Sequence, residues 1–173
     1  MSDVSTIPRY AGGMSTEARW LSPDEQRLWR RWLRLNAELN ATLQREMQDD
    51  SGLSSPDFEV LVNLTDSPEG RVRVSDLACQ MLWERSRLSH HVTRMERRGL
   101  VRRAGCAEDG RGAFIEITEL GRSTIERAAP GHVETVRGLV FDVLTDEDTA
   151  RLEHLVDKLL ARLEAAEGSR ATV

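Results

Sequence analysis

The spacing of the apolar residues changes at Gly99, and this change limits the possible folds more than any other feature of the chain. From Glu84 to Arg98 the apolar residues recur every three or four positions, which is the period of an α-helix. After Gly99 come two β-prone segments, "LVRRAG" and "AFIEIT", separated by the turn-like "CAEDGRG". The sequence therefore predicts a helix that ends at Gly99 and a β-hairpin directly after it.

The residues before this region predict a long first helix. "SPDE" at Ser22–Glu25 combines a capping serine, a proline suited to the first turn and a glutamate that can complete a capping box. The helix is expected to end near "DDSG" at Asp49–Gly52. Residues 1–20 are polar and predicted to form a flexible arm. The apolar stripe of the helix consists of Leu28, Trp32, Leu35, Leu39 and Leu43.

Two shorter helices are expected between the first helix and the helix that ends at Gly99. Ser55 is predicted to cap the second helix, with Pro56 at its first position, and "DSPEGR" is expected to end it. Ser75 is predicted to cap the third, "SDLACQML". Three helices followed by a hairpin predict a winged helix-turn-helix lobe over residues 54–117.

Two further helices are predicted after the hairpin. The fifth helix is expected to begin near Thr118, and Pro130 and Gly131 are expected to kink or restart it. "TDED" at Thr145–Asp148 is predicted to cap the last helix. One side of that helix is apolar and consists of Leu152, Leu155, Val156, Leu159, Leu160 and Leu163.

The helices at the two ends of the chain expose more apolar surface than a lone helix can hide. Residues 21–53 and 118–167 are therefore predicted to pack together and against a second copy of the chain, as a helical dimerisation lobe. Residues 168–173 are expected to form a tail. The predicted fold class is mainly α, with a small β wing.

The positive charge of the chain is concentrated in its middle. The net charge is −5, but ten arginines face only five acidic residues between Arg71 and Arg111. The rest of the chain carries −10. This asymmetry indicates a basic face for a polyanion on an acidic body, and the alternative is a solvated helix surface.

Several classes of protein are not expected from this composition. The chain contains no run of about 18 apolar residues and no apolar signal segment, and Cys79 and Cys106 are too few for a disulfide framework. A cytoplasmic protein is therefore expected. Paired carboxylates, a glycine-rich phosphate loop and a nucleophile–base pair are missing, so neither an enzyme nor a bound cofactor is expected.

The fourth helix has one apolar and one polar side. At 100° per residue, Leu88, Val92 and Met95 share one side, which is expected to face the core. Arginine can bind guanine with two hydrogen bonds, and serine, threonine and histidine can reach base edges. The sequence therefore predicts a recognition helix for a DNA major groove. Its polar side carries Ser86, Arg87, His90, Thr93, Arg94 and Arg97.

The turn of the hairpin contains a second candidate for DNA contact. Arg111 is expected to enter a minor groove, with Asp109 holding it by a charge-assisted pair. Arg85 and Arg103 are expected to hold phosphates. The predicted DNA-binding residues are thus Arg85, Ser86, Arg87, Ser89, His90, Thr93, Arg94, Arg103, Asp109 and Arg111.

The segments "LACQMLWERSRLSHHVTRMERRGLVRR" and "DGRGAFIEITELGR" together resemble the MarR family of bacterial transcription regulators. The element order extends the resemblance over residues 21–165. The chain departs from the family at Glu84, where many members have serine. Glu84 could cap the helix, accept from cytosine N4 or repel phosphate. The residues that fit the family pattern are Met95, Glu96, Arg98, Gly99, Leu100, Val101, Arg103, Asp109, Arg111, Ile117, Thr118 and Gly121.

The resemblance implies a homodimer whose first and last two helices interlock and which binds a pseudo-palindromic operator. It implies that the usual output is repression, relieved by a small ligand or by oxidation. The family's base-reading positions fall on Ser86 and His90, and its wing arginine on Arg111. The alternative is a winged-helix adaptor that binds proteins and not DNA. The outward Ser/Arg/His face of the fourth helix argues against an adaptor.

A site for an effector is suggested by three tryptophans. In the family, aromatic ligands bind between the dimer helices and the DNA-binding lobe, and Trp29, Trp32 and Trp83 could line such a pocket. The alternative places Trp32 in the core and Trp29 in the dimer interface. Both cysteines are interpreted as buried or incidental thiols. No metal site is expected, because neighbouring histidines such as His90 and His91 point about 100° apart.

Overall fold

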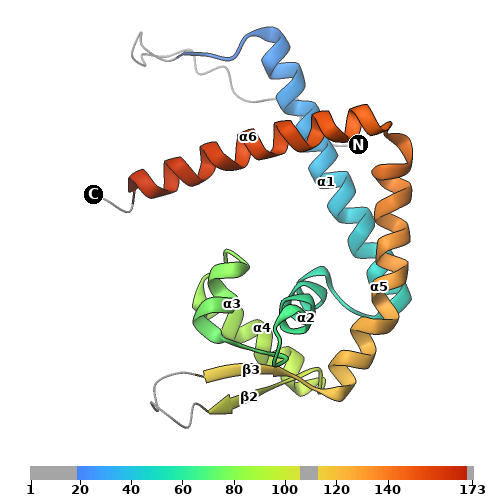
Figure 1. Cartoon of the computed structure of the whole chain (residues 1–173), viewed down its shortest axis with the longest axis vertical. Coiled ribbons are helices and arrows are strands. Elements are labelled where there is room, and N and C mark those ends of the chain that lie inside the picture. The colour runs from blue at the N-terminus through green and yellow to red at the C-terminus, as the bar shows by residue number, and fades with distance from the viewer. Residues whose placement is uncertain (1–18, 106–112, 171–173) are drawn as a thin grey trace, which may run out of the picture. The chain divides into compact units, whose positions relative to one another are not determined.

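The structure is a computed structural model that describes residues 19–105 and 113–170 (Figure 1). Most of the predicted N-terminal arm, residues 1–18, lies outside the described residues. The fold is mainly α with a small β wing, as predicted, and the wing belongs to a three-stranded antiparallel sheet. The elements are α1 (Pro23–Ser51), α2 (Ser55–Asp66), β1 (Arg71–Arg73), α3 (Val74–Gln80), α4 (Arg85–Arg97), β2 (Val101–Gly105), β3 (Ala113–Ile117), α5 (Glu119–Leu139), the 3-10 helix η1 (Phe141–Val143) and α6 (Asp146–Arg170).

The chain divides into two compact units, residues 1–37 and 38–173, and the boundary falls within α1. In the first unit α1 begins with the predicted capping box. The backbone N–H of Ser22 donates to Glu25 Oε2 over 2.7 Å, and the N–H of Glu25 donates to Ser22 Oγ over 3.2 Å. Large apolar side chains of this unit are exposed in the single chain, among them Leu28, Trp29, Trp32, Leu33 and Leu35.

The starts of α2 and α3 differ from the sequence prediction. Ser54, and not Ser55, caps α2, because Asp57 lies three residues after Ser54 and completes the box: Ser54 N–H donates to Asp57 Oδ2 over 3.0 Å, and Asp57 N–H to Ser54 Oγ over 3.3 Å. Ser75 does not cap α3. The N-cap position is Arg73, and the Ser75 hydroxyl donates to its neighbour Asp76 inside the first turn.

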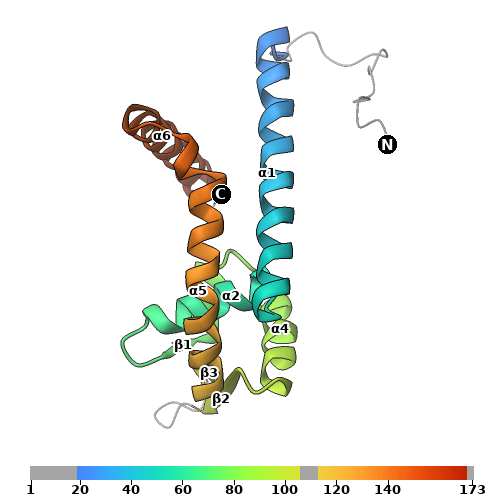
Figure 2. The same ribbon diagram turned by 90° about the vertical axis from the view of Figure 1, so that its right-hand side faces the viewer.

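The hairpin of β2 and β3 gains a third strand that the sequence did not predict. Strand β1 pairs with β3, and the order in the sheet is β1-β3-β2. Val72 and Arg103 both lie opposite Ile115, whose side chain is fully buried. Figure 2 shows β1 beside the other two strands, where α5 also begins. The sheet therefore closes one side of the core formed by α2, α3 and α4.

The core of the second unit lies between α2, α3, α4 and the sheet. Leu88, Val92 and Met95 of α4 are buried, as the helical period predicted. They pack in one cluster with apolar side chains from the other elements, including Leu61, Leu64, Leu77, Val101 and Ile115. Burial of one side of α4 fixes which of its residues face solvent.

The helix α5 continues through Pro130 and Gly131 as one element, so the predicted restart is wrong. Proline removes one backbone donor and favours an interruption. Here packing holds the helix on both sides of Pro130. Ala128 is buried, and the ring of His132 lies 4.6 Å from that of Phe58 on α2, measured between centroids. Tertiary contacts therefore outweigh the local preference.

The last helix, α6, begins with the predicted cap. Asp148 Oδ2 accepts from both the N–H and the hydroxyl of Thr145, and the N–H of Asp148 donates back to Thr145 Oγ1 over 3.2 Å. The helix continues to Arg170, into residues predicted as a tail. The apolar residues predicted to line one side of it, from Leu152 to Leu163, are between 37% and 61% exposed in the single chain.

Candidate DNA-binding interface

The helix α4 leaves a polar surface in solvent. We call this set of residues the α4 surface. All of its side chains are exposed except Thr93, which is half-buried. Because the opposite side of the helix is held in the core, these side chains have a fixed direction. The α4 surface consists of Arg85, Ser86, Arg87, Ser89, His90, Thr93 and Arg94.

The turn before α4 is held by backbone hydrogen bonds. Leu82 N–H donates to Cys79 O over 3.1 Å, and Trp83 N–H donates to Ala78 O over 2.9 Å. Leu82 has a φ of 52°, which is uncommon for a residue with a side chain. Glu84 occupies the N-cap position, but its side chain makes no capping hydrogen bond. The capping role that the sequence left open for Glu84 is therefore not used.

Arg103 of β2 binds two residues of the α4 surface. Its Nη2 donates to the backbone oxygen of Ser89 over 3.0 Å, to Ser89 Oγ over 3.2 Å and to Thr93 Oγ1 over 3.1 Å. Its backbone N–H donates to Glu96 Oε1 over 3.1 Å. The structure thus brings three predicted DNA-binding residues together and ties β2 to α4.

Two other arginines of the α4 surface contact aromatic side chains. The guanidinium carbon of Arg87 lies 4.1 Å from the ring centroid of Trp83, a cation–π distance. Arg94 Nη2 lies 2.8 Å from His91 Nδ1. The rings of Trp83 and His91 meet edge to face, with centroids 5.4 Å apart. Arg87 is therefore held by Trp83, and Arg94 by His91.

A buried charged cluster beneath α4 was missed in the sequence. His91 Nε2 lies 3.0 Å from Asp57 Oδ1, and both side chains are less than 10% exposed. Arg98 Nη1 donates to Asp57 Oδ2 over 2.6 Å, and its Nη2 donates to Gly52 O over 3.0 Å. The sequence does indicate that His91 is buried, because it lies three residues after Leu88 and so on the core side of the helix. No pattern in the sequence indicates its contact with Asp57, which lies 34 positions earlier.

The buried carboxylate of Asp57 stays charged over a wide pH range. Burial by itself would raise the pKa of Asp57, but the close approach of His91 and the hydrogen bonds from Ser54 and Arg98 outweigh it and hold that pKa well below its ordinary value. A buried carboxylate with these donors is satisfied. Asp57 therefore acts as a fixed negative charge between α2 and α4.

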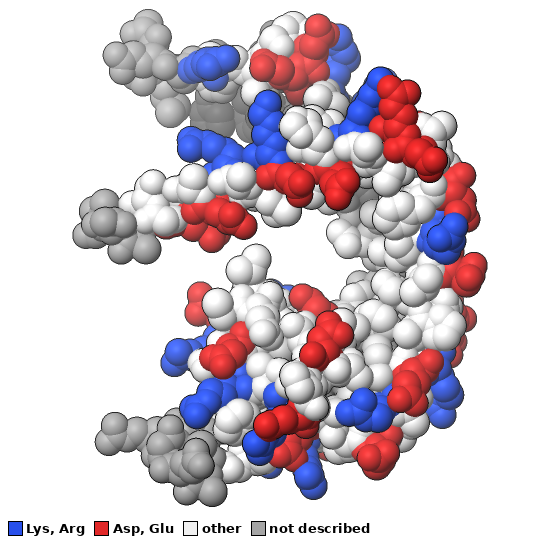
Figure 3. Space-filling view, viewed as in Figure 1, with Lys and Arg blue, Asp and Glu red and all other residues white. Residues whose placement is uncertain are grey.

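Several arginines outside α4 are paired with acids. Arg71 pairs with Glu69 and Arg102 with Glu116, both at 2.7 Å between nitrogen and oxygen. On the face seen in Figure 3, blue and red side chains are interspersed over the lobe that carries α2, α3 and α4. Among the described residues, ion pairs to acids are not found for Arg85, Arg87, Arg94 and Arg97 of α4. Four arginines without an acidic partner in the described ranges thus lie on this one helix.

Some predicted residues lie outside this arrangement. Asp109, Arg111 and Cys106 lie outside the described residues. Cys79 is exposed and carries a free thiol, so of the two alternatives, a buried or an incidental thiol, the structure excludes burial.

The three tryptophans of the predicted ligand pocket are divided between the units. Trp29 and Trp32 belong to residues 1–37 and are 48% and 40% exposed, so Trp32 is not a core residue of the single chain. Trp83 belongs to the second unit and packs against its core. The pocket predicted from these residues stays a prediction.

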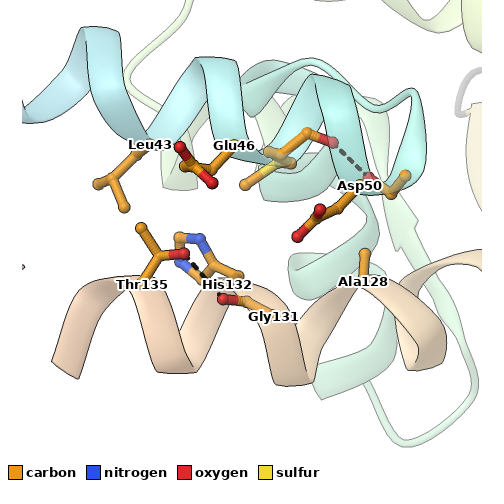
Figure 4. A pocket seen from close by; sticks show the side chains of 9 residues that line it. Leu43, Glu46, Asp50, Ala128, Gly131, His132 and Thr135 are labelled. Carbon is orange, nitrogen blue, oxygen red and sulfur yellow. Dashed lines mark hydrogen bonds between the residues drawn. The ribbon is translucent and has the colours of Figure 1, made fainter. Parts of the chain in front are cut away.

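A narrow cleft lies between the second half of α1 and α5 (Figure 4). Asp50 and Glu46 face His132 and Thr135 across it. Its cavity volume of about 10 Å³ is far below that of a typical small-molecule pocket. Partial burial lowers the pKa of His132. Within the described ranges, no three His, Cys, Asp or Glu side chains lie close enough to hold a metal ion.

The chain was compared with known proteins. The model of the MarR family matches residues 51–112. AbsC, a MarR family transcriptional regulator from Streptomyces coelicolor, has a similar structure with a TM-score of 0.81 and 41% sequence identity, and the match covers 86% of this chain and 99% of AbsC. The chain belongs to the MarR family. It is a transcriptional regulator with a winged helix-turn-helix lobe.

Two further relatives of this MarR-family chain carry information about function. Sco3205 of Streptomyces coelicolor, solved in complex with DNA, is 40% identical with a TM-score of 0.80, and the match covers 84% of this chain and 91% of Sco3205. The transcriptional repressor YetL of Bacillus subtilis is 28% identical over 112 residues, which are 65% of this chain and 66% of YetL. No helix of the described residues is long and apolar enough to cross a membrane.

Proposed function

We propose that this MarR-family chain binds double-stranded DNA as a homodimer and represses transcription from a pseudo-palindromic operator. The observation that carries the proposal is the α4 surface: a row of exposed arginine, serine and histidine side chains on a helix whose other side is locked in the core. A helix of this kind fits the major groove of B-form DNA. The DNA complex of Sco3205 and the name of YetL support the same function.

The residues divide into three roles. Ser86 and His90 read base edges from the middle of the α4 surface, and Arg87 and Arg94 bind bases or phosphates beside them. Arg85, in the first turn, binds phosphate. Arg111 of the hairpin turn enters the minor groove, and Asp109 orients it by a charge-assisted pair, roles proposed from the sequence alone.

Arg103 has a role different from the phosphate contact expected from its charge. Its guanidinium already donates to Ser89 and Thr93, so these three side chains are engaged with one another. Arg103 therefore sets the angle between β2 and α4. That angle decides whether the hairpin and the helix reach neighbouring grooves at the same time.

Apolar surface supports the homodimer. Six large apolar residues of α6, and seven described residues of the first unit, are exposed in the single chain. Monomeric proteins rarely expose contiguous patches of this kind. Residues 21–53 and 118–167 therefore form a dimerisation lobe. A small aromatic effector that binds near the tryptophans would act by shifting the spacing of the two DNA-binding lobes.

The function is tested by selecting duplexes from a random-sequence DNA library with the purified full-length protein. We expect an enriched pseudo-palindrome, bound as two chains per duplex. The logarithm of its affinity should fall linearly with the logarithm of the salt concentration, because arginines release counterions from phosphates. Equal binding to the enriched and a scrambled duplex, with an affinity that does not change with salt, would contradict the proposal and favour an adaptor.

A further inference from the structure

We propose that His91 is a positioning residue for DNA recognition, because it holds the guanidinium of Arg94 on the α4 surface through Nδ1 and is itself held by Asp57. The inference rests on the proposed DNA-binding function and adds to it a residue that never touches DNA. His91 is 8% exposed, so its ring lies beneath the surface that Arg94 presents. The effect of His91 on DNA affinity is therefore transmitted through Arg94.

The contact between Arg94 and His91 defines the state of the imidazole ring. A guanidinium has only donors, so His91 Nδ1, 2.8 Å from Arg94 Nη2, accepts and carries no proton. The single ring proton of the neutral imidazole is then on Nε2. That nitrogen lies 3.0 Å from Asp57 Oδ1, and a carboxylate only accepts. Of the two neutral tautomers, the contacts therefore fit the one with its proton on Nε2.

The attraction between His91 and Asp57 is mainly electrostatic. Nε2 approaches Oδ1 closely but lacks the alignment of a hydrogen bond. The edge-to-face contact with Trp83, at an interplanar angle of 90°, adds a second restraint on the ring plane. Asp57 in turn is held by Arg98, which also binds Gly52 O. The orientation of His91 is thus set by α2, α4 and the turn before α4.

The consequence for binding is preorganisation. Arginine has many side-chain rotamers, and ordering an exposed arginine on DNA costs conformational entropy. His91 removes part of this cost before DNA arrives, because it restricts Arg94 to conformations in which Nη2 reaches His91 Nδ1. A leucine at position 91 would fill a similar volume in the core but offer no acceptor. A glutamine would offer both an acceptor for Arg94 and a donor for Asp57.

A double-mutant cycle tests the proposal, with the duplex enriched by the wild-type full-length protein as the probe. We expect His91→Leu to weaken binding about three- to tenfold, the effect of one lost hydrogen bond, and His91→Gln to stay within about twofold of wild type. In an Arg94→Gln background, His91→Leu should cause no further loss. If His91→Leu lowers DNA affinity by the same factor in the wild-type and Arg94→Gln backgrounds, the proposal is overturned, because a residue that only supports folding acts independently of Arg94.

The imidazole itself provides a measurement that does not depend on the leucine variant folding. In ¹⁵N-labelled wild-type protein, His91 is expected to show the tautomer with the proton on Nε2, and its Nδ1 resonance should move in Arg94→Ala, a change at an exposed residue. A proton on Nδ1 in the wild type, or a resonance that does not respond, would overturn the inference while leaving DNA binding intact. If the wild type does not prefer its selected duplex to a scrambled one, the proposed function fails, and the inference with it.

Discussion

Arg98 Nη1 donates to Asp57 Oδ2 over 2.6 Å and joins two residues that are 41 positions apart in the sequence. The same carboxylate oxygen accepts from the backbone N–H of Ser54 in the capping box of α2. One buried carboxylate therefore holds both the start of α2 and the residue that follows α4. The stability of the DNA-binding lobe should depend on it strongly.

We expect the Asp57 carboxylate to make the fold sensitive to acid. Because the pKa of Asp57 is lowered in the folded protein, its contribution to the free energy of unfolding is complete above the ordinary value of 3.8 and is lost as the pH falls below it. Asp57→Asn should lower the free energy of unfolding by about 2 kcal/mol at pH 7, since Arg98 and His91 lose a charged partner. Urea denaturation should show that the free energies of unfolding of wild type and Asp57→Asn differ less at pH 3 than at pH 7.

The exposed Asp66 at the end of α2 provides the control for this change. Asp66→Asn should leave both the free energy of unfolding and its pH dependence close to those of wild type. Equal acid sensitivity in wild type and Asp57→Asn would refute the role of Asp57.

The cap of α2 can be identified by comparing two adjacent serines. Ser54→Ala removes the acceptor of the Asp57 N–H and should cost about 1 kcal/mol of stability. Ser55→Ala changes a residue inside the first turn and should be neutral or slightly stabilising, because alanine is the better helix former. Thermal unfolding followed by circular dichroism separates the two. A larger loss for Ser55→Ala would restore the assignment made from the sequence.

Gly121 is required by close packing between α5 and the chain after α4. A Cβ at this position would overlap the backbone oxygen of Leu100, which cannot move aside as a flexible side chain would. We expect Gly121→Ala to lower the free energy of unfolding by about 2 kcal/mol or more. Gly138, in the same helix, has open space where a Cβ would be, so Gly138→Ala should raise stability by about 0.5–1 kcal/mol. Chemical denaturation should show changes of opposite sign in the free energy of unfolding of the two variants. Changes of the same sign would contradict the packing argument.

The hydrogen bonds of Arg103 to α4 should contribute more to DNA affinity than the positive charge of Arg103 does. Arg103→Ala removes the hydrogen bonds to Ser89 and Thr93, and we expect the affinity for the selected duplex to fall at least threefold, with a stability loss of about 1 kcal/mol or less. Arg102→Ala removes the same charge from the neighbouring position, where the side chain pairs with Glu116. Fluorescence anisotropy at one salt concentration compares the two. Equal losses of DNA affinity in Arg103→Ala and Arg102→Ala would assign the effect to charge alone.

The predictions from sequence failed where two local signals competed or where the partner was distant. "SSPD" offers two serines as caps, and only the reciprocal bond from Asp57 selects Ser54. Strand β1 has only three residues, too few for its alternation to be recognised, and it forms by pairing with the edge of β3. Pro130 is a strong local interruption signal, and packing around Ala128 and His132 outweighs it.

The sequence by itself determined the order of the six α-helices and the β2–β3 hairpin, the buried side of α4 and the end of that helix at Gly99, which has a φ of 75°. These features depend on periodicity, caps and backbone preferences, which act over a few neighbouring residues. Only the tertiary structure decided that His91 meets Asp57 and that Arg103 reaches Ser89. Such contacts join residues brought together by packing, and no local pattern records which distant side chains will share a buried space.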